Sequence, residues 1–182
     1  MDRVGQPGRR ADREERVTDS QEHTFVIDQI STRNNKLDEL KQEFDELDVR
    51  DRLEMLLDFS DGLPDLPESY RALRDAGENR VHECQTPVYM WVEVVDGRVQ
   101  IYADVPRESP TVRGFISLLV SALSGATPAD VLAVRPTLLT ELGLVEALGM
   151  VRMRGLHAIL HRIKTEVQRA LAEARSSDAS AT

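Results

Sequence analysis

The sequence predicts an α+β domain in which helices pack on one face of a small, curved antiparallel sheet. Two runs of alternating apolar residues, 88–95 and 99–105, flank Asp96-Gly97, a dipeptide that favours a type I′ hairpin turn. Elsewhere the apolar residues recur every three or four positions, which is the period of an amphipathic helix. The length of 182 residues suits one domain with a single core.

Helical spacing before the hairpin predicts a first helix over about 37–47, with Asn34 or Asn35 as N-cap, and a second over about 53–59. Gly62 and the prolines after it end the second helix. Asn79–His82 is a candidate third strand. Further helices are predicted over 68–76, from Ser109-Pro110 to Gly125, from Thr127, from about Thr137, and over about 154–174.

The two ends of the chain are predicted to be disordered tails around one folded unit. Residues 1–22 are polar and charged, with few apolar side chains to bury, and residues 175–182 are small and polar. The folded domain is therefore expected over 23–174.

Composition excludes several classes of function. With a net charge of −9, the chain lacks the broad basic surface expected of a nucleic-acid binder. The same charge disfavours binding to anionic membrane surfaces. No apolar run approaches the length of a membrane span, and residues 1–21 lack the apolar core of a secretory signal. With its single cysteine, the chain fits a reducing cytoplasm.

Cys84 is the only cysteine and the first candidate for chemistry. One thiol cannot form an internal disulfide or a multi-thiolate metal site, and the four histidines show no metal-ligand spacing, so no metal is expected. The Cys84 thiol can still act as a nucleophile, because thiolate chemistry needs only one accessible sulfur. The alternative is an inert buried cysteine. The polar, loop-like segment before it favours a reactive thiol.

The residues around Cys84 carry a family resemblance. The family loop reads Asn-x-(Val/Ile)-x-Gly-Cys-Gln-Ser-x-Val-Trp, and this chain has Asn79, Val81, Cys84, Gln85, Thr86, Val88 and Tyr89 in that order. Matching motifs follow in the family's order: Leu63-Pro64-x-Leu66, Val112-Arg113-Gly114, Ser124-Gly125-x-Thr127-Pro128, Leu142-Gly143-Leu144 and Arg152-x-x-Gly155-Leu156-x-Ala158. Over roughly 37–171 the chain resembles the SufE family, the sulfur-acceptor proteins that serve cysteine desulfurases.

This resemblance implies a fold related to the IscU-like scaffold proteins. It also implies that Cys84 accepts persulfide sulfur by transpersulfuration, stimulates the desulfurase and passes sulfur on for iron–sulfur cluster assembly. Such a protein is a carrier rather than an autonomous enzyme and needs no cofactor of its own. Its implied partners are a SufS-like desulfurase, which uses pyridoxal phosphate, and a SufBCD-like scaffold.

The chain departs from the family pattern beside the thiol. Glu83 stands where the family has Gly, and Thr86, Pro87 and Tyr89 replace Ser, a polar residue and Trp. Glycine would allow positive φ or close backbone approach. Glutamate instead brings a negative charge, which disfavours the thiolate.

Other residues receive roles from the resemblance. Arg152 would be a cation near the Cys loop, the alternative being a surface arginine at the start of the last helix. Glu108 and Arg113 fall in the segment that the family uses for partner docking, although Glu108 could simply complement the helix dipole. His82 beside the thiol could act as a base.

Two other functions stay open. A Cys–His hydrolase would pair Cys84 with His157 or His161, but no local hydrolase signature surrounds the cysteine. These histidines lie one helical turn apart, and without a third ligand they are expected to be a solvated or half-buried pair rather than a metal site. A desulfurase-binding module would dock on the partner without using Cys84.

Overall fold

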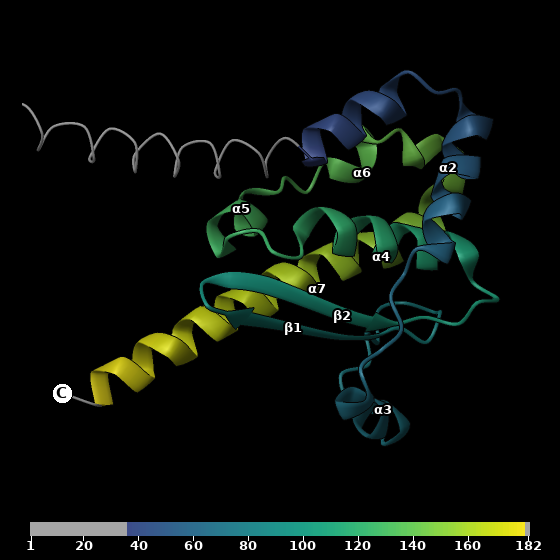
Figure 1. The fold of residues 1–182 in the computed structure, drawn as a ribbon. Helices are drawn as coiled ribbons and strands as arrows, with labels where there is room; N and C mark the ends of the chain where they lie inside the picture. Colours follow the sequence, from purple (N-terminus) through teal and green to yellow (C-terminus); the bar gives the residue numbers. More distant parts are fainter. Residues whose placement is uncertain (1–35, 181–182) are drawn as a thin grey trace, which may run out of the picture.

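The computed structural model describes the backbone of residues 36–180 and the side chains up to residue 176. Residues 1–35, which include the predicted N-caps Asn34 and Asn35 and the predicted N-terminal tail, lie outside the described residues. A first helix covers 36–45. The later elements are α2 (Val49–Asp61), α3 (Glu68–Asp75), β1 (Tyr89–Val95), β2 (Arg98–Asp104), α4 (Pro110–Leu123), α5 (Pro128–Ala133), α6 (Leu138–Glu141) and α7 (Leu144–Ser180) (Figure 1).

The predicted hairpin is confirmed. β1 and β2 pair antiparallel with Tyr89 opposite Asp104 and Val95 opposite Arg98. The turn residues Asp96 and Gly97 have φ of 50° and 70°, as a type I′ turn requires. The candidate third strand is reduced to one isolated bridge between Arg80 and Tyr89, so the described sheet has two strands.

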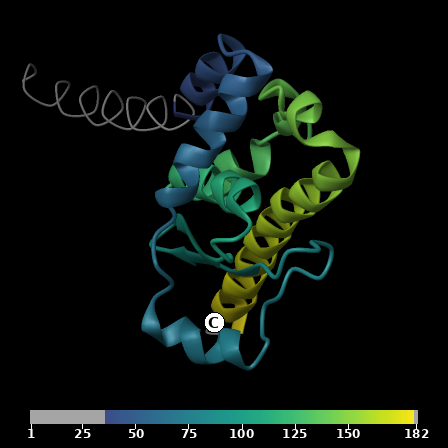
Figure 2. The ribbon, with the colours of Figure 1, turned by 90° about the vertical axis from the view of Figure 1, so that its right-hand side faces the viewer.

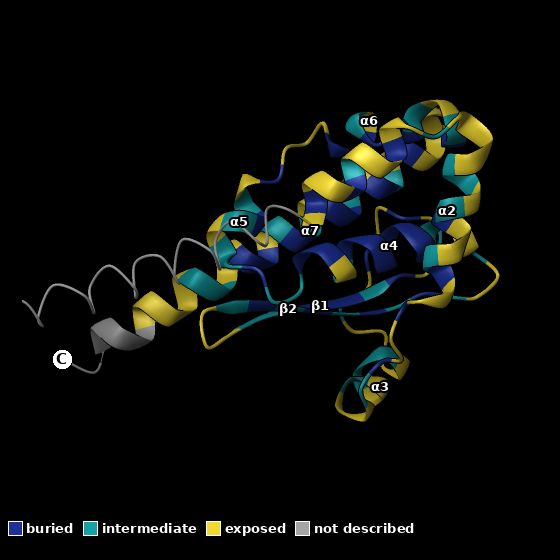
Figure 3. Cartoon of the chain, turned by 45° about the horizontal axis from the view of Figure 1, so that its top comes forward, coloured by how far each residue is buried: buried dark blue, intermediate teal, exposed yellow. Residues whose placement is uncertain are grey.

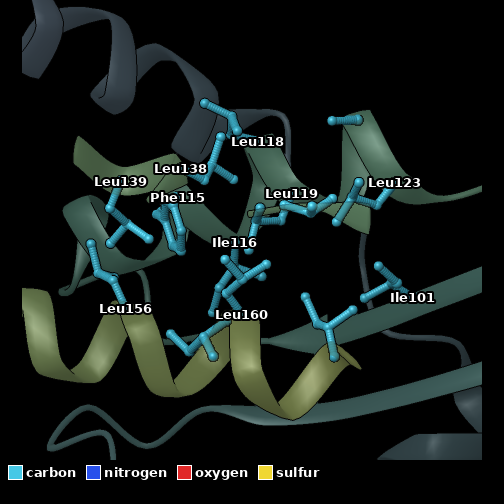
Figure 4. Close-up of a cluster of buried hydrophobic side chains, with 14 of the residues drawn as sticks. Ile101, Phe115, Ile116, Leu118, Leu119, Leu123, Leu138, Leu139, Leu156 and Leu160 are labelled. Carbon is cyan, nitrogen blue, oxygen red and sulfur yellow. The ribbon is translucent and has the colours of Figure 1, made fainter. Parts of the chain in front are cut away.

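The helices pack on the hairpin through α4. Nine of its residues are buried, and Figure 3 shows it dark blue along most of its length. Figure 4 shows side chains of α4, α6 and α7 meeting in one cluster, with Ile101 of β2 at its edge. This confirms the sequence-based expectation of a central helix that is apolar on most sides.

The helix caps agree with the sequence only in part. Thr127 and Asp130 form a capping box at α5, where each side chain bonds the backbone N–H of the other. Asp48 caps α2 through the N–H groups of Arg50 and Asp51. Ser109 precedes Pro110 as predicted, but its side chain makes no capping bond. Proline at the first position of α4 starts that helix without one.

Helix α3 lies on the opposite side of the hairpin from α4, away from the main helical layer (Figures 1 and 2). The sequence predicted the helix, but not this position. The Tyr70 ring centroid lies 5.1 Å from that of Trp91 and 5.0 Å from that of Tyr102, and its hydroxyl donates to Glu93 at 2.5 Å. Burial of the hydroxyl is the main cause that raises the pKa of Tyr70 above its ordinary value. The hydrogen bond to Glu93 and the negative charge of that carboxylate raise it further. The ring therefore covers the outer face of the sheet.

Helix α7 is broken near its start and runs further than the sequence indicates. Gly149 has φ of 72° and ψ of 162°, which interrupts the helix before Met150. The helix then continues to Ser180, so residues 175–180 are helical rather than part of the predicted C-terminal tail. Within residues 36–180, no helix combines the length and hydropathy of a membrane span.

Candidate functional site

Cys84 lies near the tip of a loop that is closed at its neck by backbone hydrogen bonds. The N–H of Val81 donates to the carbonyl oxygen of Val88 at 2.8 Å, and the N–H of Met90 donates to that of Asn79 at 3.1 Å. Val81 and Val88 are fully buried. The two strands of the neck are therefore anchored to the core, while residues 82–87 form the loop between them.

The thiol of Cys84 faces inward. The residue is 6% exposed, whereas its neighbours His82, Glu83 and Gln85 are exposed. Its N–H donates to the carbonyl oxygen of Val81 at 3.3 Å, which folds the chain back on itself. The loop therefore presents polar side chains to solvent and turns its sulfur toward the protein.

Gly155 of α7 forms the surface against which the thiol rests. A Cβ placed on Gly155 would lie 3.4 Å from the Cys84 Sγ and 3.8 Å from its Cα. A methyl group would thus just fit, and a larger side chain directed at the loop would press on the cysteine. This contact gives a physical reason for the glycine in the Arg-x-x-Gly-Leu motif.

Arg152 and Glu83 do not form a pair. Arg152 is exposed and precedes Gly155 by three residues, which places it on the same face of α7 as the thiol contact. Within the described part of the chain, no ion pair joins it to Glu83. The charges of Arg152 and Glu83 therefore do not neutralise each other through an ion pair beside the Cys loop. The predicted roles of Arg152, Glu83 and His82 remain predictions.

The docking role expected for Arg113 conflicts with its burial. Its side chain is 7% exposed and donates to three backbone carbonyl oxygens, those of Ser60, Val105 and Leu63, at 2.8, 2.9 and 3.2 Å. It joins the end of α2, the Leu-Pro segment and the end of β2. Glu108 is exposed ahead of α4, so its docking role stays a prediction.

The histidines of α7 do not meet the thiol. His157 lies two residues after Gly155, about 200° around the helix axis, and His161 lies six residues after it, about 240° around. Both line a separate hollow of about 170 Å³ with Lys164 and Gln168. The arrangement gives no support to a Cys–His hydrolase. No group of three or more potential ligands among the described residues is placed to hold a metal ion.

Sequence reasoning found Cys84 but missed two features of its setting. It did not predict that the thiol would point inward, because residue order does not specify which way a loop turns. It also gave Gly155 no role beyond the motif. A glycine in the first turn of the predicted last helix was the available signal, since glycine in a helix is unfavourable without a packing reason.

Fold and site together define a small α+β protein whose only thiol is sheltered between a polar loop and a helix. The chain belongs to the SufE family: residues 38–167 match it, under the description "Fe-S metabolism associated domain". This membership gives the protein a role in iron–sulfur metabolism and implies a cysteine desulfurase as its partner.

Similar proteins support this assignment. A SufE-like protein of Mycobacterium tuberculosis is 38% identical over 135 residues, which cover 74% of this chain and 92% of that protein. A solution structure of a hypothetical protein from Thermus thermophilus has a TM-score of 0.66 and 36% identity, covering 75% of this chain and 96% of the other. A chloroplastic quinolinate synthase of Nicotiana tabacum is 38% identical over 103 residues, which cover 55% of this chain and 13% of the synthase.

Proposed function

We propose that Cys84 accepts sulfur from the persulfide of a SufS-like cysteine desulfurase and carries it toward iron–sulfur cluster assembly. The observation that carries this proposal is a single thiol, 6% exposed, at the tip of a loop whose neighbouring residues are exposed. A partner can engage the loop from outside, while the sulfur itself has a protected position when the loop is closed.

The transfer is a thiol–disulfide exchange in which sulfur is the transferred group. The Cys84 thiolate attacks the terminal sulfur of the donor persulfide and forms a new S–S bond. The S–S bond within the donor breaks, and the donor cysteine leaves as a thiolate. The terminal sulfur keeps its oxidation state and its proton, and the donor thiolate takes up the proton that Cys84 lost. No external oxidant or reductant is needed.

We infer that the loop opens for this step. In the closed loop Cys84 is only 6% exposed and its Sγ faces Gly155 of α7, so we infer that the sulfur is shielded from in-line attack. The Cys84 Sγ faces the space that a side chain at Gly155 would fill, whereas the loop neck is hydrogen-bonded and buried. The tip of the loop is therefore the part that moves, and its return would shield the persulfide from other thiols.

The protein is proposed to act as a cytoplasmic carrier and activator, not as an autonomous enzyme. It needs no cofactor of its own, because the desulfurase supplies the pyridoxal phosphate chemistry that frees sulfur from L-cysteine. With Cys84 as its only cysteine, the chain has no internal thiol to release the cargo as hydrogen sulfide. The sulfur would thus remain until a downstream acceptor, such as a SufBCD-like scaffold, takes it.

Intact mass spectrometry after incubation with an active desulfurase and L-cysteine tests the proposal. We expect one added sulfur, about 32 Da, that maps to the Cys84 peptide and is removed by reductant. Cys84→Ser is the control and should stay unmodified. An unmodified wild-type thiol beside a confirmed, active cognate desulfurase would refute sulfur transfer.

Desulfurase turnover separates a carrier from a docking module. Unloading the donor persulfide frees the desulfurase for another cycle, so wild-type protein should increase alanine formation from L-cysteine. Cys84→Ser should still bind but lose this stimulation. Full stimulation by Cys84→Ser would favour a binding module that does not carry sulfur.

A further inference from the structure

The start of the continuous part of α7 exposes two large apolar side chains. Met150 is 71% exposed and Val151 is 73% exposed. The other exposed large hydrophobic residues in the described part of the chain, Val49, Leu57 and Val95, lie between 40% and 48%. Met150 and Val151 thus form the most exposed apolar pair that the structure describes, and they adjoin in sequence.

This pair lies close to the thiol. Val151 precedes Gly155 by four residues, so the two share a helical face and are separated by about 6 Å along the axis. Gly155 is the residue whose missing side chain leaves room for the Cys84 sulfur, because a Cβ there would lie 3.4 Å from it. Val151 therefore borders the place where the Cys loop rests, and Met150 adjoins it in sequence.

The break at Gly149 keeps the pair in solvent. Its φ of 72° and ψ of 162° are open to glycine and strained for other residues. Leu148, just before the break, is 8% exposed, and Met153, just after the first exposed residues, is 3% exposed. The chain thus leaves the core at Gly149 and returns to it within one turn, presenting Met150 and Val151 outward.

Basic side chains flank the apolar pair. Arg152 and Arg154 are both exposed, on a chain whose net charge is −9. Glu146 is also exposed, but it lies on the other side of the Gly149 break. The surface made of Met150, Val151, Arg152 and Arg154, here called the α7 tip, is therefore apolar with a basic edge.

We propose that the α7 tip is the surface on which the cysteine desulfurase docks, through an apolar hollow with an acidic rim. This inference rests on the proposed function and specifies where the partner binds. A donor that brings its persulfide sulfur to Cys84 must cover surface beside the loop, and the α7 tip adjoins Gly155, the residue that the sulfur faces. Apolar anchors in the centre would contribute affinity, and the arginines would speed association.

The test uses the double variant Met150→Ser/Val151→Ser and the matched control Val49→Ser/Leu57→Ser, which removes two exposed apolar side chains from α2. Both changes lie on the surface, so thermal unfolding should move little for either. By isothermal calorimetry or surface plasmon resonance, the dissociation constant for the desulfurase should rise at least about tenfold for the tip variant. It should stay within about twofold for the control.

Loading by a low-molecular-weight persulfide separates docking from chemistry. Cys84 in the tip variant should take sulfur from glutathione persulfide as fast as wild-type protein does, while loading from the desulfurase slows. Arg154→Gln should lower the association rate at low ionic strength severalfold and weaken its salt dependence.

Three outcomes would overturn the proposal. If the tip variant binds the desulfurase as wild-type protein does while wild-type Cys84 still takes up sulfur, the docking surface lies elsewhere and the proposed function stands. If wild-type Cys84 takes no sulfur from the desulfurase, the proposed function itself fails. If sedimentation shows a wild-type dimer that the tip variant dissolves, a second copy of the chain occupies the tip instead.

Discussion

Two helical glycines bring separate parts of this protein into contact, and they differ in what lies opposite. At Gly114 in α4, a Cβ would overlap the backbone carbonyl oxygen of Leu56 in α2. At Gly155 in α7, a Cβ would lie 3.4 Å from a side-chain atom, the Cys84 Sγ. The first glycine lets two helices meet backbone to backbone, and the second leaves space for a thiol at the tip of a loop.

Their surroundings reinforce the difference. Next to Gly114, Arg113 is buried and bonds three carbonyl oxygens from other segments, so the α2–α4 contact is held by hydrogen bonds as well as by packing. Next to Gly155, residues 82, 83 and 85 of the Cys loop are exposed. The comparison contrasts a contact between two helix backbones, fixed by hydrogen bonds, with a contact at the tip of an exposed loop, which the proposed sulfur transfer would have to open.

The largest expected effect is on the first contact. Gly114→Ala places a methyl group inside the backbone of α2, so the helices must separate, and we expect the free energy of unfolding to fall by about 3 kcal/mol. Urea unfolding measures this. Gly62→Ala is the control, because its Cβ would lie 3.4 Å from the Phe59 oxygen and 3.5 Å from the Ser117 Oγ. An equal fall in the free energy of unfolding for Gly114→Ala and Gly62→Ala would show that Gly114 is not required for a close approach of the two helices.

The second contact should respond in reactivity more than in stability. Gly155→Val pushes against Cys84 and should expose it, raising the alkylation rate by roughly three- to tenfold while lowering stability by about 1 kcal/mol. Gly155→Ala fits at 3.4 Å and should change the rate little. Iodoacetamide labelling reports Cys84 alone, since the chain has no other cysteine. An unchanged rate in Gly155→Val would mean that the thiol does not rest on α7.

Charges beside the thiol should act weakly and separately. Glu83 and Arg152 are exposed, so solvent screens both, and Glu83→Gly should raise the alkylation rate at neutral pH by about twofold at low salt. Arg152→Ala should lower it slightly. No ion pair joins Glu83 and Arg152 in the described structure. The change in the logarithm of the alkylation rate for the double variant should therefore equal the sum of the changes for the two single variants. A strong interaction between them would reveal a pair that forms in solution.

The smallest effect is expected where the first helix meets α6. Hydrogen bonding from Thr137 at 2.6 Å, followed by the ammonium of Lys41 at 3.2 Å, lowers the pKa of Glu141 from its ordinary value of 4.5. A lowered folded-state pKa stabilises the protein above the unfolded-state value, and this contribution disappears as pH falls through the folded-state value.

The Glu141→Gln variant should therefore be slightly less stable than wild-type protein at pH 7, by under about 1 kcal/mol, and the gap should close below pH 4.5. Urea unfolding at a series of pH values checks this. The exposed acid Glu39 on the first helix provides the control, because Glu39→Gln should show no such convergence. A gap that persists in acid would mean that the Glu141 carboxylate charge is not the cause.

Much of the fold follows from local patterns. The alternation on both sides of Asp96-Gly97 and the positive φ that those residues require determine the hairpin and its register. Thr127 and Asp130 define the start of α5 because a capping box needs only residues three apart. The candidate third strand near Asn79 was wrong beyond a single bridge, because pairing depends on a partner edge that local sequence does not describe.

The site was predicted less completely. Cys84 was identified because it is the only thiol and lies in a recognisable loop. Arg113 was given a docking role because it falls in the segment that the family uses for partner docking, whereas three carbonyl oxygens from distant segments hold it in the core. Such acceptors come together only after the helices and the hairpin have packed.

By itself, the sequence determined most elements of this protein and the residue proposed as its nucleophile, because periodicity, turn chemistry and a lone cysteine are local properties. Tertiary structure alone decided that the Cys84 thiol faces Gly155, that Met150 and Val151 stand beside it in solvent, and that α3 covers the outer face of the sheet. These arrangements depend on which surfaces remain unpaired once the core has closed around α4, and that is a property of the packed chain.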